Sequence, residues 1–205
     1  MAYWPHEYDW RAQEAKLNQF SQFRTEVAGQ GLHFIHEHGK GPNPTPLLLI
    51  HGWPDSFHRM HKLIGPLTDP ASFGGDPDDA FDVIVPSLPG FGFSDRPSVS
   101  GMTSPRAAEL LAKLMIEVLG YQRFAAAGGD IGSRVARLLA LAHPESLIGI
   151  HLTDIAFRER SLSPLTCRIP LKRRSSFSVP SGGGSRRREG TRCFNRRGHK
   201  PSHMR

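Results

Sequence analysis

The residues best suited to chemistry are six consecutive ones, Gly128 to Ser133, which read Gly-Gly-Asp-Ile-Gly-Ser. A short apolar stretch at 123–127 precedes them and apolar residues at helical spacing follow them, so we expect a turn between a buried strand and a helix. The small-small-Asp-x-Gly-small pattern is that of a nucleophile elbow, with Asp130 where lipases carry serine. The glycines suit a sharp, strained turn, which leaves no room for neighbouring Cβ atoms. An ordinary aspartate that caps a helix is the alternative that these residues leave open.

A second group of chemical interest is His51-Gly52-Trp53-Pro54, directly after the apolar run Leu47–Ile50. A continuous apolar run of this length is typical of a parallel strand buried on both faces. Further apolar runs predict three more buried strands, at 83–85, 124–127 and 148–152. Both candidate groups therefore lie where a buried strand is expected to end.

Helix and strand patterns continue on either side of these groups. The remaining elements are expected at 8–20, 23–27, 32–37, 57–67 and 104–119, and the strand with the buried run 83–85 is expected to begin at residue 81. Asp9 can cap the first helix, and a turn at 29–31 would join the first two strands. Ser104 and Pro105 suit the N-cap and the first position of the last helix. Strand–helix alternation over 47–152 predicts an α/β fold with a mostly parallel sheet flanked by helices.

Three histidines, at positions 33, 36 and 38, raise the question of a metal site. Strand alternation puts His36 and His38 on the same face, but no cysteine or further nearby histidine completes a ligand set. The aspartates of the Gly- and Pro-rich segment 71–80 read as a surface cluster rather than a cation site. We therefore expect neither a metal nor a cofactor.

Charge is distributed unevenly along the chain. Residues 161–205 hold 12 of the 26 Lys and Arg residues and one of the 19 Asp and Glu residues, a net charge of +11. Residues 1–160 hold the other 14 basic and 18 acidic residues, a net of −4, which argues against nucleic acid as a partner of the body. Both cysteines, Cys167 and Cys193, lie in the basic part, so the body needs no disulfide.

Targeting signals and membrane spans are not expected. The N-terminus shows no basic segment followed by an apolar run, and no apolar stretch is long enough to cross a bilayer. We therefore expect a cytoplasmic protein with no membrane partner.

Regular patterns stop near residue 160. No helical or strand periodicity is visible beyond it, and the composition, with Gly182–Gly184 and Arg186–Arg188, is that of a disordered segment. One interpretation is a basic tail that binds nucleic acid. We favour another, in which a GC-rich coding region is read out of frame, because the change is abrupt and falls in the middle of a domain.

Taken together, the motifs resemble the epoxide hydrolases of the α/β-hydrolase fold. His51-Gly52-Trp53-Pro54, the Gly- and aromatic-rich loop 86–94 and the elbow at Asp130 occur in that family's order. Segments 8–11, 23–27 and 32–36 are similar to the N-terminal extension of its microsomal-type branch, here without a membrane anchor.

This resemblance covers residues 3–157 and implies three segments. They are an epoxide hydrolase N-terminal extension (1–45), the N-terminal half of the α/β-hydrolase core (46–157) and a disordered basic tail (158–205). The expected fold is thus a truncated α/β-hydrolase fold, without the cap domain and the C-terminal strands.

The chemistry that the resemblance implies is hydrolysis of a small-molecule epoxide to a vicinal diol through an ester on Asp130. Aspartate side chains are ionised at neutral pH, so such a nucleophile needs no partner base. The backbone N–H groups of Trp53 and Ile131 would form the oxyanion hole. Residues expected to shape the site without reacting are His51, Gly52, Pro54, Gly128, Gly129 and Gly132.

Several parts of the family's machinery have no counterpart that we can assign. In the family, a water-activating histidine and its acid partner follow the cap domain, and two cap tyrosines protonate the epoxide oxygen. The tyrosines here are Tyr3, Tyr8 and Tyr121, and we assign no role to His199 or His203 in the anomalous tail. We therefore expect neither a general base nor its acid partner in this chain, and no turnover.

Two alternatives remain beside the epoxide hydrolase interpretation. A haloalkane dehalogenase uses the same aspartate elbow but wants indole N–H donors for the halide. In this chain Ile131 stands where the epoxide hydrolase family usually has tryptophan, and an isoleucine side chain offers no N–H donor. The N-terminal extension also favours the epoxide branch. The second alternative is a non-catalytic fragment.

Overall fold

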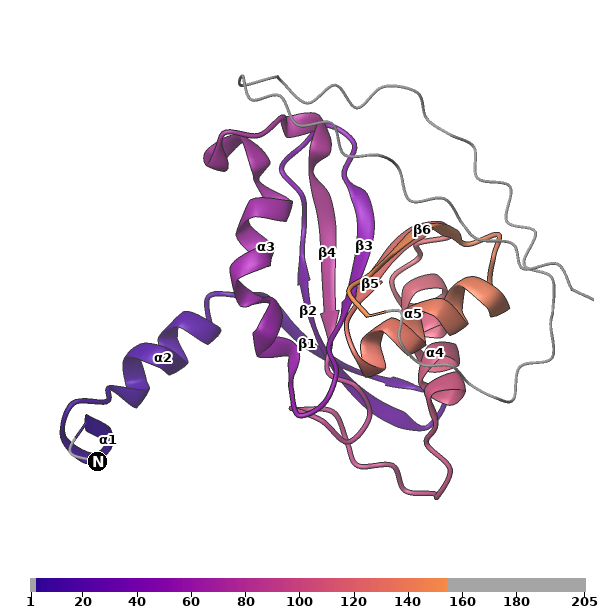
Figure 1. Cartoon of the computed structure of the whole chain (residues 1–205), viewed down its shortest axis with the longest axis horizontal. Helices are drawn as coiled ribbons and strands as arrows, with labels where there is room; N and C mark the ends of the chain where they lie inside the picture. Colours follow the sequence, from indigo (N-terminus) through magenta and orange to yellow (C-terminus); the bar gives the residue numbers. More distant parts are fainter. Residues whose placement is uncertain (1–2, 155–205) are drawn as a thin grey trace, which may run out of the picture. The chain divides into compact units, whose positions relative to one another are not determined.

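The computed structural model describes residues 3–154 of the 205-residue chain (Figure 1). The expectations for the basic tail lie outside the described residues. Helical elements are α1 (Tyr3–His6), α2 (Trp10–Leu17), η1 (Phe57–Met60), α3 (His61–Thr68), η2 (Pro70–Phe73), η3 (Pro77–Asp79), α4 (Ser104–Lys113), η4 (Leu114–Val118) and α5 (Ile131–Ala142). The strands are β1 (Gln22–Val27), β2 (Gln30–Glu37), β3 (Thr45–Ile50), β4 (Phe81–Pro86), β5 (Phe124–Gly128) and β6 (Leu147–Leu152).

Six strands form one sheet in the order β1-β2-β4-β3-β5-β6. β3 pairs in parallel with β4 and β5, and β5 in parallel with β6, whereas β1 and β2 continue the sheet antiparallel beside β4. The expected mostly parallel sheet flanked by helices is confirmed. Ile50 lies opposite Gly128 at the ends of β3 and β5, so the chain leaves both strands at the same edge of the sheet.

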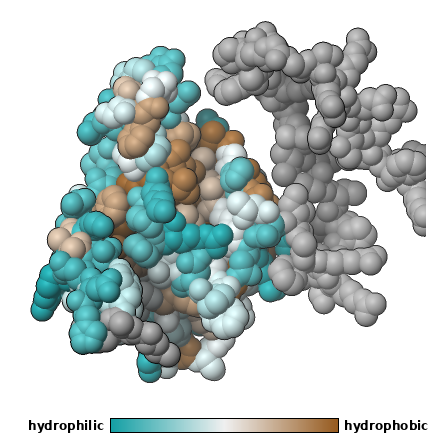
Figure 2. Space-filling view, turned by 60° about the vertical axis from the view of Figure 1, so that its left-hand side comes forward, coloured by the Kyte–Doolittle hydropathy of each residue, from teal (hydrophilic) through white to brown (hydrophobic). Residues whose placement is uncertain are grey.

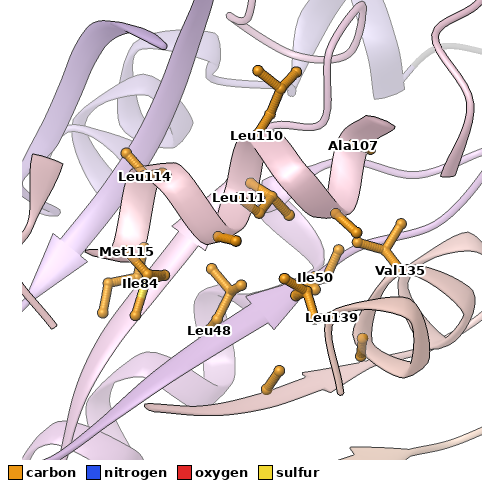
Figure 3. Close-up of a cluster of buried hydrophobic side chains, with 14 of the residues drawn as sticks. Leu48, Ile50, Ile84, Ala107, Leu110, Leu111, Leu114, Met115, Val135 and Leu139 are labelled. Atoms are coloured by element: carbon orange, nitrogen blue, oxygen red, sulfur yellow. The ribbon is translucent and has the colours of Figure 1, made fainter. Parts of the chain in front are cut away.

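Apolar side chains of β3 explain why its sequence is continuously hydrophobic. Successive residues of a strand face opposite sides of the sheet. Leu48 and Ile50 pack in the cluster formed with α4 and α5 (Figure 3). Leu47 and Leu49 pack on the other side, against the buried side chains of η1 and α3. Helices therefore cover both faces of the strand that leads to His51.

The turn between β1 and β2 begins one residue earlier than the sequence suggested. Val27 pairs with Gln30, so the loop is Ala28-Gly29 and not residues 29–31. Both loop residues have positive φ, 48° and 79°, the backbone twist that two-residue hairpins favour. Gly31 belongs to β2, where a Cβ atom would collide with the Asp95 carboxylate. Gly31 is therefore not part of the turn.

Two helix starts can be compared with expectation. Asp9 caps α2 as predicted, because its carboxylate accepts the Ala12 N–H at 3.0 Å. The N-cap of α4 is Thr103 and not Ser104, so Pro105 is the second helical residue. Proline is tolerated there because the first N–H groups of a helix have no partner within it.

The last described strand, β6, is not buried as its apolar sequence suggested. Ile148 and Ile150 are 50% and 38% exposed. β6 pairs with β5 on one side and ends the sheet within residues 3–154. Apolar side chains are buried only where another element covers them, and the periodicity of a strand does not indicate which element, if any, will cover it.

Candidate active site

Asp130 occupies a strained turn between β5 and α5. β5 ends at Gly128 and α5 begins at Ile131, so only Gly129 and Asp130 form the turn. Asp130 has φ 53° and ψ −121°, a left-handed φ that is costly for a residue with a Cβ atom. Such strain, of order 1–3 kcal/mol, persists only where the surrounding structure enforces it and is concentrated at functional sites.

Two glycines near Asp130, Gly132 in α5 and Gly52 after β3, allow the close packing that enforces this turn. A Cβ atom on Gly132 would overlap the carbonyl oxygen of Ile50, at the end of β3. A Cβ atom on Gly52 would lie 2.6 Å from Asp130 Oδ2. The first turn of α5 and the segment after β3 therefore approach the elbow more closely than any other residue type permits.

The segment that follows β3 places a backbone donor on the Asp130 carboxylate. Trp53 N–H donates to Asp130 Oδ2 at 2.7 Å, across 77 positions of sequence. Ile131 is the first residue of α5, where helix geometry leaves N–H groups available for other acceptors. The structure thus brings Asp130 and the predicted donor Trp53 together, with Ile131 next to the carboxylate in the chain.

His51 is fully buried and supports this segment. Its Nε2 accepts the Leu88 N–H at 3.0 Å, so Nδ1 carries the proton and donates to Gly52 O at 2.9 Å. Burial lowers the pKa of His51, which keeps the imidazole neutral. Both ring nitrogens are engaged with backbone groups, an arrangement that supports the expected structural role.

Comparisons with known proteins agree with this geometry. The family described as alpha/beta hydrolase fold matches residues 45–172, more than half of the chain, and the family described as epoxide hydrolase N terminus matches residues 1–60. A putative epoxide hydrolase of Stigmatella aurantiaca is 49% identical over 159 residues, which cover 77% of this chain and 36% of the relative. Epoxide hydrolase 1 of Oryctolagus cuniculus is 42% identical over 156 residues, covering 74% of this chain and 34% of that protein.

The chain belongs to the epoxide hydrolases of the α/β-hydrolase fold. Solved structures agree: the Aspergillus niger epoxide hydrolase is 34% identical with a TM-score of 0.66, over 76% of this chain and 40% of that one. The juvenile hormone epoxide hydrolase of Bombyx mori is 32% identical with a TM-score of 0.65, over 73% and 39% of the two chains. The present chain spans about a third of the length of the curated relatives. Within residues 3–154, no helix is both long and apolar enough to cross a membrane.

Trp53, whose backbone N–H binds the Asp130 carboxylate, also lines an open hollow. Trp53, Pro54, Asp55, Ser56 and Phe91 line it, with a volume of about 460 Å³. Trp53 is 67% exposed and Phe93, on the same loop as Phe91, is 58% exposed. Figure 2 shows one face of the described residues, where apolar groups reach the surface between polar ones. Asp130 is not among these lining residues, so the hollow is connected with the elbow through Trp53.

The aromatic-rich loop is held in place by His33, a residue to which the sequence assigned no role. Its Nδ1 lies 2.8 Å from Ser87 Oγ, and its backbone N–H donates to Ser94 Oγ at 2.9 Å. The imidazole is 3% exposed and packs edge-on against the rings of Phe57 and Phe93. Burial, followed by the charge of Arg24, lowers the pKa of His33 to about 4. In the sequence, the only mark of His33 is its place between the apolar residues Leu32 and Phe34.

The other two histidines, His36 in β2 and His38 directly after it, lie in a separate polar cluster. His36 Nε2 is 3.0 Å from the Tyr121 hydroxyl, which donates to Asp82 Oδ2 at 2.8 Å. His38 lies beside His36, with ring centroids 4.4 Å apart. The cluster contacts the start of β4, whereas the elbow lies at the ends of the parallel strands. Among residues 3–154, no group of three or more His, Cys, Asp or Glu side chains could hold a metal ion.

A carboxylate that the sequence analysis missed contacts the elbow from the other side. Asp154 follows β6, and its Oδ2 accepts the Asp130 N–H at 2.8 Å. That hydrogen bond, together with one from Thr153, lowers the pKa of Asp154 below its ordinary value. The strand pairing of β5 with β6 brings the two aspartates together, and no local pattern around residue 154 indicates this.

Proposed function

We propose that Asp130 is the nucleophile of an epoxide-opening reaction, the first half of epoxide hydrolysis. The observation that carries the proposal is the Trp53 N–H at 2.7 Å from Asp130 Oδ2. This bond distinguishes the two carboxylate oxygens. Oδ2 is held by the donor, which leaves Oδ1 to attack.

In the first step, Oδ1 attacks a carbon of the epoxide and that carbon's bond to the ring oxygen breaks. An ester forms on Asp130, and the ring oxygen leaves as an alkoxide that takes a proton from water. Asp130 Oδ2 becomes the carbonyl oxygen of the ester and stays beside the Trp53 N–H. When water later attacks the ester carbon, the negative charge develops on Oδ2, where the N–H groups of Trp53 and Ile131 would stabilise it. Each such donor is typically worth about 3 kcal/mol of barrier.

The hydrolytic half needs a base to activate water, and we assign none in this chain. Tyr121 is also unsuited to protonate the epoxide oxygen, because its hydroxyl donates to Asp82 at the other end of the sheet. We therefore propose that the chain can be alkylated once by an epoxide and does not turn over. Small epoxides are the proposed substrate class, since the similar proteins of Stigmatella aurantiaca and Oryctolagus cuniculus are named epoxide hydrolases.

Incubation of the 205-residue chain with styrene oxide, followed by intact mass spectrometry, tests this proposal. We expect an adduct of one styrene oxide per chain, which peptide mapping places on Asp130. Asp130→Asn should form no adduct, because an amide oxygen is a far weaker nucleophile than a carboxylate. Asp95→Asn is the matched control, since Asp95 is an exposed aspartate paired with Arg24, and it should react like the unaltered chain. An adduct on Asp130→Asn, or repeated release of diol, would contradict the proposal.

A further inference from the structure

The backbone of the elbow has an unusual requirement for a hydrogen-bond acceptor. β5 ends at Gly128 and α5 begins at Ile131, so the Asp130 N–H belongs neither to the strand ladder nor to the helix. Backbone N–H groups that leave both kinds of ladder need another partner. Asp154 Oδ2 supplies it at 2.8 Å.

Thr153, Asp154 and Ser133 together hold the backbone on both sides of the turn, and we refer to these three residues as the clamp. Thr153 N–H donates to Gly128 O at 3.1 Å, so the residue before the turn is held from β6 as well. Thr153 Oγ1 donates to Asp154 Oδ2 at 3.1 Å and orients that carboxylate. Ser133 Oγ, in the first turn of α5, donates to Gly128 O at 2.6 Å, and Asp154 N–H lies 3.4 Å from this hydroxyl.

The clamp keeps the strained backbone of the turn from relaxing. Asp130 has φ 53°, a conformation that relaxes unless neighbouring groups fix it. The direction of the Asp130 carboxylate depends on that backbone angle, because the side chain is attached to the strained residue. Holding the Asp130 N–H therefore also holds Oδ2 against the Trp53 N–H.

We propose that Asp154 is a positioning residue, whose carboxylate fixes the Asp130 backbone so that the Asp130 side chain stays aligned for attack. The inference rests on the proposed function of Asp130 for its effect on chemistry, but its effect on the backbone is independent of that function. Asp154 touches no reacting atom in this scheme. Its influence passes through the Asp130 peptide group.

Two variants separate the hydrogen bond from the charge. Asp154→Ala removes the acceptor, and Asp154→Asn keeps an acceptor oxygen but not the negative charge. The matched control is Asp76→Ala, since Asp76 accepts the Asp78 N–H at 2.9 Å at the start of η3, the same kind of bond away from the elbow.

The first measurement is hydrogen–deuterium exchange of the Asp130 amide, resolved by residue. We expect a protected amide in the unaltered chain, at least about tenfold faster exchange in Asp154→Ala and near-normal protection in Asp154→Asn. Asp76→Ala should leave the Asp130 amide unchanged. Fast exchange in the unaltered chain, or unchanged exchange in Asp154→Ala, would overturn the inference.

The second measurement is the rate of alkylation by styrene oxide as a function of its concentration. Asp154→Ala should lower the maximal rate about tenfold, with the half-saturating concentration unchanged within about twofold. Asp154→Asn should recover most of that loss, which a general loss of folding would not produce. If Asp154→Ala does not fold, Asp154→Asn decides: an Asp130 amide that exchanges there as fast as an unprotected amide, with alkylation as fast as in the unaltered chain, overturns the inference. A protected Asp130 amide in a chain that never forms an adduct would instead overturn the proposed function alone.

Discussion

At the elbow, strain and close packing are divided between different residues. The left-handed φ falls on Asp130, the residue with the functional side chain. The adjacent glycines at 128, 129 and 132 show no left-handed φ, and each would clash with a neighbour if it carried a Cβ atom. The glycines of the pattern thus allow other segments to approach the elbow closely, while Asp130 itself takes the unusual turn conformation.

Gly132 allows a direct test of this interpretation. Gly132→Ala adds a methyl group against the Ile50 carbonyl oxygen, and overpacking of this kind costs about 1–3 kcal/mol. Alanine would also favour helix α5 by about 1 kcal/mol, so the net loss of unfolding free energy should be about 2 kcal/mol or less. We expect adduct formation on Asp130 to fall about tenfold or more, because the elbow must shift.

The matched control is Gly149→Ala, measured by urea unfolding and by intact mass after styrene oxide treatment. Gly149 lies in β6, where an added Cβ atom meets nothing within 4 Å. Its unfolding free energy should stay within about 1 kcal/mol of the unaltered chain. Equal reactivity of Gly132→Ala and Gly149→Ala would contradict the packing argument.

At the scale of elements, the site loop depends on β2. Ser87 N–H donates to His33 O, and Ser94 Oγ bridges the His33 N–H and Ser87 O. The loop that carries Phe91 and Phe93 is therefore fastened to a strand of the N-terminal hairpin. This contact gives the N-terminal part of the chain a role in shaping the hollow that Trp53 and Phe91 line.

His33 makes this fastening sensitive to pH. Its pKa is lowered from 6.5 to about 4 in the folded chain, mainly by burial. Above pH 6.5 the imidazole is neutral in both states and its contribution to stability is complete. Between pH 6.5 and about 4 the unfolded chain binds a proton that the folded chain does not, so stability falls as the pH falls, by up to about 3 kcal/mol. Chemical unfolding at several pH values should show this loss.

His33→Gln removes the titrating group while keeping a hydrogen-bonding side chain. The variant should lose less stability between pH 6.5 and 4 than the unaltered chain does. His36 and His51, whose pKa values are also lowered by burial, should supply the remaining slope. An unchanged slope in His33→Gln would show that His33 is not protected from protonation in the folded state.

At the scale of the whole molecule, the described part of the sheet, within residues 3–154, ends in an exposed strand beside the elbow. Ile148 and Ile150 are exposed on β6, and within residues 3–154 no strand pairs with the outer edge of β6. An unpaired edge with exposed apolar side chains is a template for association between chains. The same strand leads into Thr153 and Asp154, so its order matters to the elbow.

We therefore predict that the 205-residue chain associates through this edge. Ile148→Lys combined with Ile150→Lys should shift the chain toward the monomer, because like charges on an edge strand disfavour pairing. Leu63→Lys, at a residue 48% exposed on α3, is the control and should change association little. Size-exclusion chromatography with light scattering provides the measurement. An unaltered chain that stays monomeric at all concentrations tested would refute this prediction.

The sequence by itself determined the class of fold, the order of the main elements and the position of the elbow. These are local properties: apolar runs, helical spacing, glycines and a family pattern all lie within short windows. The tertiary structure alone decided that His33 fastens the site loop, that Asp154 contacts the elbow and that β6 is exposed. Each of these depends on pairing between segments far apart in the chain, and the side chains involved carry no local mark of the partner they will meet.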